Sequence, residues 1–200
     1  MKRFFAILTV VILTTTIASS QARIGMKAGN TLSNVYGDDV TNTDMRFGFH
    51  TGMFFQFGND RVKYGLETLW NQKGFNSEYT YDVYDPLGGY YYIVSEDVTF
   101  TLNYLYVNNN LSIFVADPVS LNIGLQLGLF LGGNAEGETL DYDDVTALDL
   151  GINSGVTWWI NDAINVEARY TLGLLDVPWE SSVSFYNSAI QLSIGWAFVN

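Results

Sequence analysis

In residues 120–132 every second side chain is large and apolar, and the intervening ones are mostly small or polar. This period of two is that of a β-strand, whose successive side chains point to opposite faces. A tilted strand of about 11 residues crosses the apolar band of a transmembrane barrel, which is about 25 Å tall. The stretch therefore predicts a membrane-spanning strand with its aliphatic face toward lipid. That face consists of Leu121, Ile123, Leu125, Leu127, Leu129 and Leu131.

Seven further stretches alternate in a similar way, so the chain is predicted to contain eight strands. They cover residues 23–34, 47–57, 62–73, 100–115, 148–158, 164–174 and 188–198. The stretch at 100–115 is the least regular, because three consecutive asparagines interrupt it. Its outward side chains are predicted to be Leu105, Val107, Leu111 and Ile113.

The connections between these strands are alternately short and long. Short ones lie at 58–61, 116–118 and 161–163, and longer ones follow the first, third, fifth and seventh strands. Tight periplasmic turns and longer extracellular loops are typical of outer-membrane barrels. The pattern predicts an all-β fold, an eight-stranded antiparallel up-and-down transmembrane β-barrel. The longest connection, 74–97, is rich in Tyr and Asp and could extend its flanking strands as a hairpin beyond the membrane.

The N-terminus has the three parts of a secretory signal peptide. Lys2 and Arg3 precede an apolar run at 4–13, and small and polar residues follow up to Ala22. A transmembrane anchor would need about 20 apolar residues, and three threonines interrupt this run. We expect a signal peptide at 1–22, cleaved after Ala22, and one barrel domain at 23–200.

Composition and charge agree with this class of protein. Only 15% of residues are charged, against about 25% in ordinary soluble domains, while 16% are aromatic. The chain has no cysteine and a formal net charge of −12. Two of its 9 basic residues and none of its 21 acidic ones lie in the leader, so the mature chain would carry −14. This excess of acid argues against a nucleic-acid partner.

Five segments resemble a known family. In these segments the chain is similar to small outer-membrane β-barrel proteins, the porin-family or OmpA-like barrel domains common in Bacteroidetes. The resemblance covers essentially the whole mature chain and concerns architecture rather than activity. It implies contact with outer-membrane lipid and lipopolysaccharide, and insertion by the barrel-insertion machinery. Two departures are a more polar fourth strand and two residues beyond the usual terminal aromatic, Phe198. The segments are GMKAGNTLSN (25–34), YGLETLWNQKGF (64–75), LNYLYVNNNL (102–111), INVEARYTLGL (164–174) and IQLSIGWAF (190–198).

Charged residues within the strands fall on the inward phase, where they predict a polar network in the lumen. Such a network either forms a selectivity constriction or a proton path, or it fills the barrel as a salt-bridged plug. The plug is favoured because side chains fill the interior of eight-stranded barrels. Gly124, Gly128 and Gly132 are predicted to leave room for these charges. The network residues are Lys27, Lys63, Glu67, Lys73, Asp149, Glu167 and Arg169.

Two other features of the sequence, a histidine and an acidic loop, are candidates for chemical sites. His50, the single histidine, would need a nucleophile and an orienting acid to serve as an acyl-hydrolase base, and no partner serine is apparent. It is predicted to be a hydrogen-bonded interior residue, so no catalytic residue, cofactor or enzymatic activity is expected. The acidic loop at 136–144 offers oxygen ligands for calcium but lacks the spacing of a calcium loop, which favours a solvated loop.

The aromatic residues suggest how the barrel sits and what it recognises. Trp158, Trp196 and Phe198 are expected near the periplasmic ends and Trp70 and Phe75 near the extracellular ends, as interfacial girdles. The Tyr-rich segment at 79–92 is the best candidate for binding an extracellular ligand, since Tyr provides contact area at low entropy cost. The predicted role is structural or surface interaction through the loops. The alternatives are a narrow channel and a soluble exported β-barrel carrier of a lipophilic ligand.

Overall fold

The computed structural model describes residues 22–37, 43–141, 145–177 and 184–199. Residues 1–21 of the expected signal peptide lie outside these ranges, as do parts of three predicted loops. In the part of the chain that is described, no helix has the length and apolar character needed to cross a membrane.

One antiparallel sheet contains all the strands of the described residues, and it closes on itself. Its order is β4-β3-β2-β1-β9-β8-β7-β5-β6, and an additional pairing of β4 with β5 completes the ring. The predicted fold class is confirmed. The short β6 pairs with the end of β5 in a region expected to be loop, so that expectation is wrong there. The strands are β1 (Arg23–Tyr36), β2 (Thr43–Gly58), β3 (Val62–Asp85), β4 (Tyr90–Ala116), β5 (Val119–Ala135), β6 (Glu138–Leu140), β7 (Leu148–Trp159), β8 (Ile164–Asp176) and β9 (Tyr186–Val199).

The ladder register gives the barrel its tilt. A circuit of paired residues that starts at Ile24 returns to β1 at Asn34, ten residues further along the strand. A stagger of this size is what closing a tilted sheet requires. The circuit runs through Phe55, Leu66, Asn109, Leu125, Ile152, Leu172 and Ser188.

The two faces of each strand differ as the alternation predicts. On β5 the six predicted lipid-facing side chains are 44–60% exposed, whereas Ser120, Gln126 and Phe130 on the opposite face are buried. The outward residues assigned to the irregular fourth strand are also exposed, which confirms that assignment. Phe75 is an exception among the girdle residues, since it is only 7% exposed and contacts Phe185 inside the barrel. The prediction of a girdle position for Phe75 is wrong.

The glycines of β5 make room for neighbours in the wall rather than for the charged network. A Cβ on Gly124 would lie 2.2 Å from Asn110 Oδ1, and one on Gly128 would lie 2.4 Å from the Tyr106 ring. Both neighbours come from β4, which pairs directly with β5. A Cβ on Gly132 would meet nothing within 4 Å. The prediction that these glycines accommodate the charged residues is therefore wrong.

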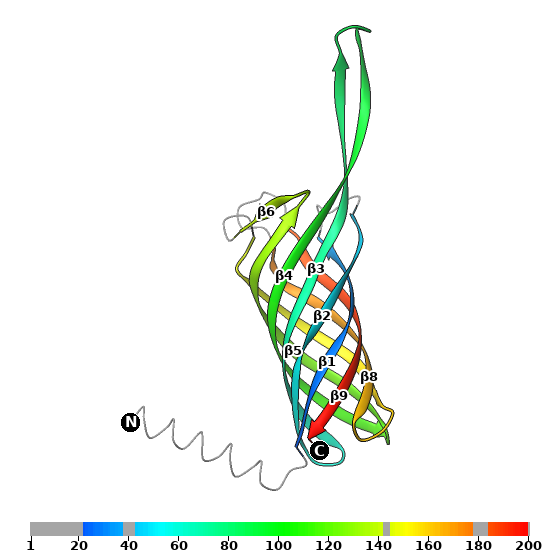
Figure 1. The fold of residues 1–200 in the computed structure, drawn as a ribbon, viewed down its shortest axis with the longest axis vertical. Coiled ribbons are helices and arrows are strands. Elements are labelled where there is room, and N and C mark those ends of the chain that lie inside the picture. Colours follow the sequence, from blue (N-terminus) through cyan, green and yellow to red (C-terminus); the bar gives the residue numbers. More distant parts are fainter. Residues whose placement is uncertain (1–21, 38–42, 142–144, 178–183, 200) are drawn as a thin grey trace, which may run out of the picture.

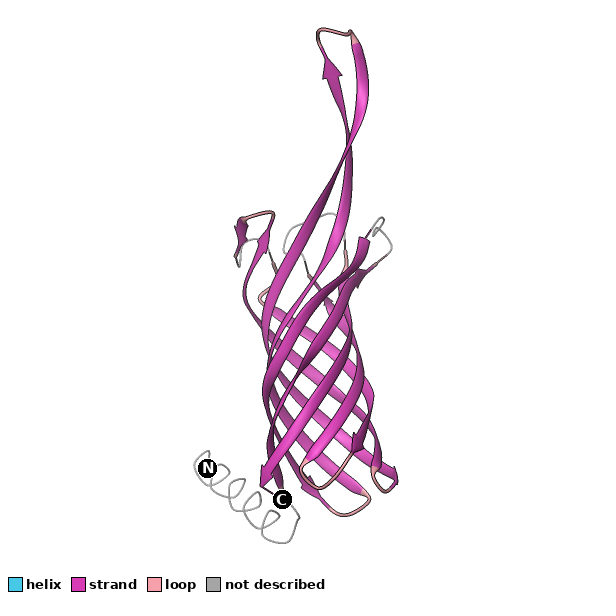
Figure 2. Cartoon of the chain, turned by 45° about the vertical axis from the view of Figure 1, so that its right-hand side comes forward, coloured by secondary structure: helices cyan, strands magenta, loops and turns pink. Residues whose placement is uncertain are grey.

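The two ends of the barrel differ (Figure 1). The short turns and both ends of the barrel chain lie at one end, while a long β3–β4 hairpin rises from the other (Figure 2). Two of the turns use the same chemistry: Asn59 Oδ1 accepts hydrogen bonds from the amides of Arg61 and Val62, and Asn161 Oδ1 from those of Ala163 and Ile164. Asn side chains stabilise tight turns in this way. The barrel therefore has a compact end and an elaborated end.

Candidate functional site

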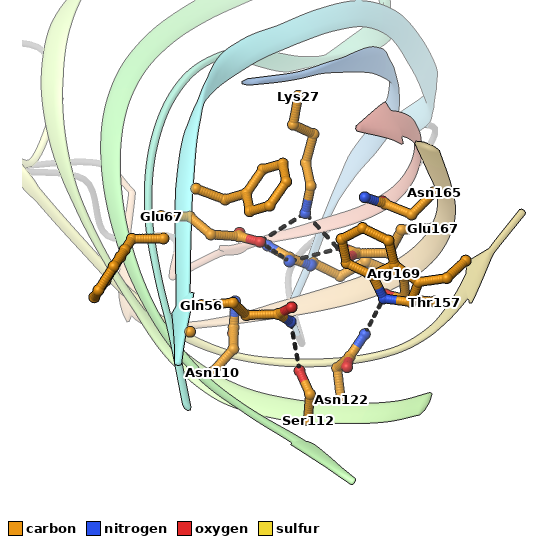
Figure 3. Close-up of a pocket in the computed structure, with 14 residues that line it drawn as sticks. Lys27, Gln56, Glu67, Asn110, Ser112, Asn122, Thr157, Asn165, Glu167 and Arg169 are labelled. Carbon is orange, nitrogen blue, oxygen red and sulfur yellow. Dashed lines mark hydrogen bonds and ion pairs between the residues drawn. The ribbon is translucent and has the colours of Figure 1, made fainter. Parts of the chain in front are cut away.

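Four charged side chains from three strands meet in the lumen (Figure 3). Lys27 Nζ lies 2.6 Å from Glu67 Oε1 and 3.0 Å from Glu167 Oε2. Arg169 donates to both oxygens of Glu67, at 2.7 and 2.9 Å, and its Nη2 lies 2.7 Å from Glu167 Oε1. All four side chains are buried. Two cations and two anions form a neutral cluster, which we call the lumen quartet.

Neutral side chains complete the surroundings of the quartet. Asn108 Nδ2 donates to Glu67 Oε2 at 3.1 Å, and Thr157 donates to Glu167 Oε2 at 3.0 Å. Asn122 in turn donates to Thr157, at 2.7 Å. The cavity beside the quartet has a volume of about 20 Å³, which is room for about one water molecule. The arrangement is that of a packed interior.

A second ion pair lies nearer the hairpin end of the lumen. Lys73 Nζ is 3.4 Å from Asp149 Oδ2 and 4.5 Å from the centre of the Tyr106 ring. The Tyr106 hydroxyl and Asn187 Nδ2 also donate to Asp149 Oδ2. The side chain of Lys73 has no exposed surface, so its ammonium depends on these neighbours.

The structure thus places six of the seven predicted network residues in two separate groups. Lys63 belongs to neither group, and its ammonium lies 5.9 Å from the centre of the Phe114 ring. Because the members come from strands far apart in the sequence, only the closed barrel brings them together. Lys27 and Glu67 are 40 residues apart, and Glu67 and Arg169 are 102 apart.

His50 has a serine partner that sequence reasoning missed. Its Nε2 lies 2.7 Å from Ser193 Oγ, and its Nδ1 lies 3.0 Å from Thr31 Oγ1. His50 and Ser193 both pair with Gly29 in the ladders on either side of β1. Since glycine has no side chain, the two residues meet across it. The pairing of both residues with Gly29 would have predicted this contact, but it can be recognised only once the strand register is known.

The His50–Ser193 pair lacks the features of a catalytic site. Within the described ranges, no carboxylate is hydrogen-bonded to His50; its two ring nitrogens face hydroxyl groups. The two side chains are 2% and 6% exposed inside the barrel wall, out of reach of a lipid substrate. A triad needs an orienting acid and access to substrate. This geometry favours the predicted structural role of an interior histidine.

Apolar clusters lie toward both ends of the polar lumen. Phe54, Trp159 and Ala197 form one near the compact end, where the Arg23 guanidinium lies 4.1 Å from the centre of the Trp159 ring. The other lies toward the hairpin end and gathers residues of β4, β5 and the connecting segments. Its buried members are Leu102, Tyr104, Tyr106, Phe130, Val145 and Val177.

The polarity of the interior also tests the alternative of a soluble carrier for a lipophilic ligand. A soluble carrier would have its apolar face inside and its polar, glycine-rich face outside. The barrel has the opposite arrangement, with the quartet inside and the leucines of β5 outside. The carrier alternative is wrong for this reason.

The acidic loop provides no metal centre within the described residues. Among them, no group of three or more His, Asp or Glu side chains is placed to hold a metal ion. Residues 142–144 of the predicted acidic loop lie outside the described ranges.

The β3–β4 hairpin is the second candidate site, and it is exposed. The ladder between its strands continues through Asp85 and Tyr90, as expected from the Tyr-rich connection. Phe75 and Phe100 stack at its base, with ring centres 4.6 Å apart, and the rings of Tyr84 and Tyr91 lie 5.0 Å apart near its tip. Six tyrosines of the hairpin are exposed to solvent. They are Tyr79, Tyr81, Tyr84, Tyr90, Tyr91 and Tyr92.

Comparisons with known proteins agree with the geometry. A family model described as "Outer membrane protein beta-barrel domain" matches residues 17–177. The fold is similar to that of neisserial surface protein A, with 12% identity, coverage of 88% of this chain and 97% of that one, and a TM-score of 0.55. It is also similar to Ail, the attachment invasion locus protein of Yersinia pestis, in complex with the heparin analogue sucrose octasulfate. In that comparison the identity is 13%, the coverage is 89% and 99%, and the TM-score is 0.52. No curated protein sequence matches the chain.

Proposed function

The chain belongs to the outer membrane protein β-barrel domain family, and from this premise we propose that it is a non-enzymatic surface-interaction protein whose contact element is the β3–β4 hairpin. Its place is the outer membrane. Barrels of this kind have tight turns on the periplasmic side and long loops outside the cell. The end with the short turns is then periplasmic, and the hairpin points away from the cell.

The observation that carries this proposal is the contrast between the hairpin and the lumen. The hairpin presents tyrosines to solvent beyond the membrane, where Tyr is well suited to recognition. The lumen, by comparison, is occupied by the quartet, the Lys73–Asp149 pair and two apolar clusters. Exposed contact area lies on the hairpin rather than in the interior.

The barrel wall has a supporting role in this proposal. Its aliphatic belt contacts outer-membrane lipid, and we expect lipopolysaccharide around the rim on the extracellular side. Insertion by the barrel-insertion machinery would use β9, which contains the sequence IQLSIGWAF (190–198). The wall then anchors and orients the hairpin.

The proposed role predicts that the purified barrel does not conduct ions. We expect planar lipid bilayers containing the protein to show no discrete conductance steps, because packed side chains fill the barrel and a passing ion would have to break the quartet. The Glu67→Ala variant, whose quartet lacks one carboxylate, is measured in the same bilayers for comparison with the wild type. Steady single-channel currents from the wild-type protein would favour the narrow-channel alternative instead.

Proteolysis of intact cells tests where the hairpin lies, and adhesion tests what it does. Chymotrypsin, which cleaves after tyrosine, should cut within residues 79–92 on intact cells and leave the barrel protected. A variant with residues 78–97 replaced by Asn-Gly should resist cutting and should still fold, because the pairs of β3 with β2 and of β4 with β5 are retained.

Cells that produce the full chain should adhere better to a panel of immobilised proteins and glycans than cells that produce the shortened variant. Cutting only after the outer membrane is permeabilised would contradict the orientation. Equal adhesion of the two cell types would contradict the surface-interaction role.

A further inference from the structure

Both edges of the β3–β4 hairpin lose their partners above the barrel rim. Pairing of β2 with β3 ends at Ser77, and pairing of β5 with β4 ends at Phe100. The two strands nevertheless stay paired with each other up to Asp85 and Tyr90. The outer part of the hairpin stands clear of the other described elements in both views (Figures 1 and 2). It is a two-stranded ribbon with two open edges.

The register shows which backbone groups point to the open edge of β4. The amide of Phe114 donates to the carbonyl of Arg61 at 2.8 Å, which identifies that pair as hydrogen-bonded. Hydrogen-bonded and non-hydrogen-bonded pairs alternate along an antiparallel ladder, and this ladder has no register shift. In steps of two residues from Phe114, the hydrogen-bonded positions of β4 include Tyr90, Tyr92 and Val94, whose backbone groups bond to β3. The amides and carbonyls of the residues between them are directed outward. Those residues are Tyr91, Ile93, Ser95, Asp97 and Thr99.

The edge of β4 has fewer protective features than the edge of β3. Natural edge strands are guarded by charges, proline or bulges. The free edge of β3 carries Glu78, Asp82 and Asp85, whereas β4 begins with six uncharged residues, YYYIVS at 90–95. A run of this kind has high β-propensity and no proline or glycine, which favours strand pairing. The edge of β4 is therefore the better acceptor for another strand.

The charge of the hairpin limits what can pair with it. Residues 74–101 contain no lysine or arginine and five acids, Glu78, Asp82, Asp85, Glu96 and Asp97. A second copy would bring the same five negative charges close to these, which opposes self-pairing. An incoming basic strand would instead gain from the acids, and its ammonium or guanidinium groups could also lie over tyrosine rings.

We propose that the open edge of β4, residues 90–99, accepts an extended, basic segment of another protein by strand addition. The inference rests on the proposed function, since it names the class of partner for the same hairpin. Main-chain hydrogen bonds to Tyr91, Ile93 and Ser95 hold the segment, as in other cases of β-augmentation. Side chains of alternate residues meet the two faces of the ribbon, and Glu96 and Asp97 select for basic residues near its base.

The test uses the full chain in lipid nanodiscs and a labelled ten-residue peptide of alternating Lys and Val. Fluorescence anisotropy measures its binding to the wild type and to two proline variants. Ile93→Pro removes an outward amide of β4 without removing a bond of the hairpin, and proline is tolerated at such edge positions. Thr80→Pro is the matched control, because it makes the same change on the edge of β3. We expect Ile93→Pro to weaken binding by about tenfold or more and Thr80→Pro by less than about twofold.

Two further peptides separate strand addition from simple charge attraction. A peptide of alternating Glu and Val should not bind. A Lys–Val peptide N-methylated at every residue should lose binding, because neither of its edges can then donate to the ladder. Equal effects of the two proline variants, or full binding of the N-methylated peptide, would overturn the proposal. If the wild type self-associates and Ile93→Pro abolishes this association, the partner of the β4 edge is a second copy of the chain and not a basic segment, which would overturn the proposal. Adhesion that depends on the hairpin but is insensitive to Ile93→Pro would leave the surface role intact and remove this inference alone.

Discussion

Replacing Glu67 by alanine should destabilise the folded barrel by about 3–5 kcal/mol, the usual cost of breaking a buried ion pair from one side. Glu67 accepts from Lys27, from both terminal nitrogens of Arg169 and from Asn108. Without it, two buried cations share the single carboxylate of Glu167. The quartet then carries one uncompensated positive charge in a site with room for about one water. Urea unfolding in lipid vesicles, followed by tryptophan fluorescence, would measure the loss.

A second substitution tests whether the loss comes from charge imbalance. The double variant Lys27→Met/Glu67→Ala restores neutrality, because Arg169 and Glu167 remain paired. Its loss of unfolding free energy should therefore be smaller than the sum of the losses of the two single variants, as expected for residues in direct contact. Glu96→Ala on the exposed hairpin is the control and should leave the free energy of unfolding nearly unchanged. A loss for Glu67→Ala no larger than for Glu96→Ala would contradict the buried quartet.

Replacing Leu125 by arginine should destabilise the barrel by about 2–4 kcal/mol, the cost of a basic residue on the lipid face near the middle of the membrane. Leu125 lies near the centre of the aliphatic face of β5, and its side chain is exposed on the outer surface of the barrel. An arginine there would have to reach water across the apolar belt. The measurement is the same unfolding experiment in lipid vesicles.

Depth along the barrel provides the matched controls for this prediction. Leu121 lies two residues from the start of β5, next to a short turn. The Leu121→Arg variant should therefore lose only about 0–1 kcal/mol, because the arginine can reach the interface. Leu87→Arg at the tip of the hairpin is 99% exposed and should cost less than about 0.5 kcal/mol. Equal costs at Leu125 and Leu87 would show that the leucine face does not contact lipid.

The inside and outside of the barrel could be predicted well from the sequence. In a strand, the direction of a side chain depends only on whether its position is odd or even. The alternation on β5 therefore assigned Leu125 outward, and that on β1 assigned Lys27 inward. The asparagines of β4 left the pattern irregular, but the phase of Leu105 and Leu111 was enough to orient that strand.

The hairpin was harder to predict because its local pattern is not one-sided. Tyrosines occupy both faces of residues 79–92, since neither face there is required to contact lipid. The sequence could indicate that β3 and β4 might extend, but not how far. Phe75 shows the same limit: its aromatic side chain and position near the rim suggested a girdle, whereas its phase along β3 turns it toward Phe185 inside.

What the sequence by itself determined is the architecture: strands that alternate, short turns at one end, and charges that point inward. These properties are local, because period and turn chemistry depend on neighbouring residues. Only the tertiary structure decided which inward residues meet. The quartet, the Lys73–Asp149 pair and the contact of His50 with Ser193 depend on the ladder registers and on the ten-residue stagger that closes the ring. A shift of one register would leave the alternation recognisable and would separate every one of these partners.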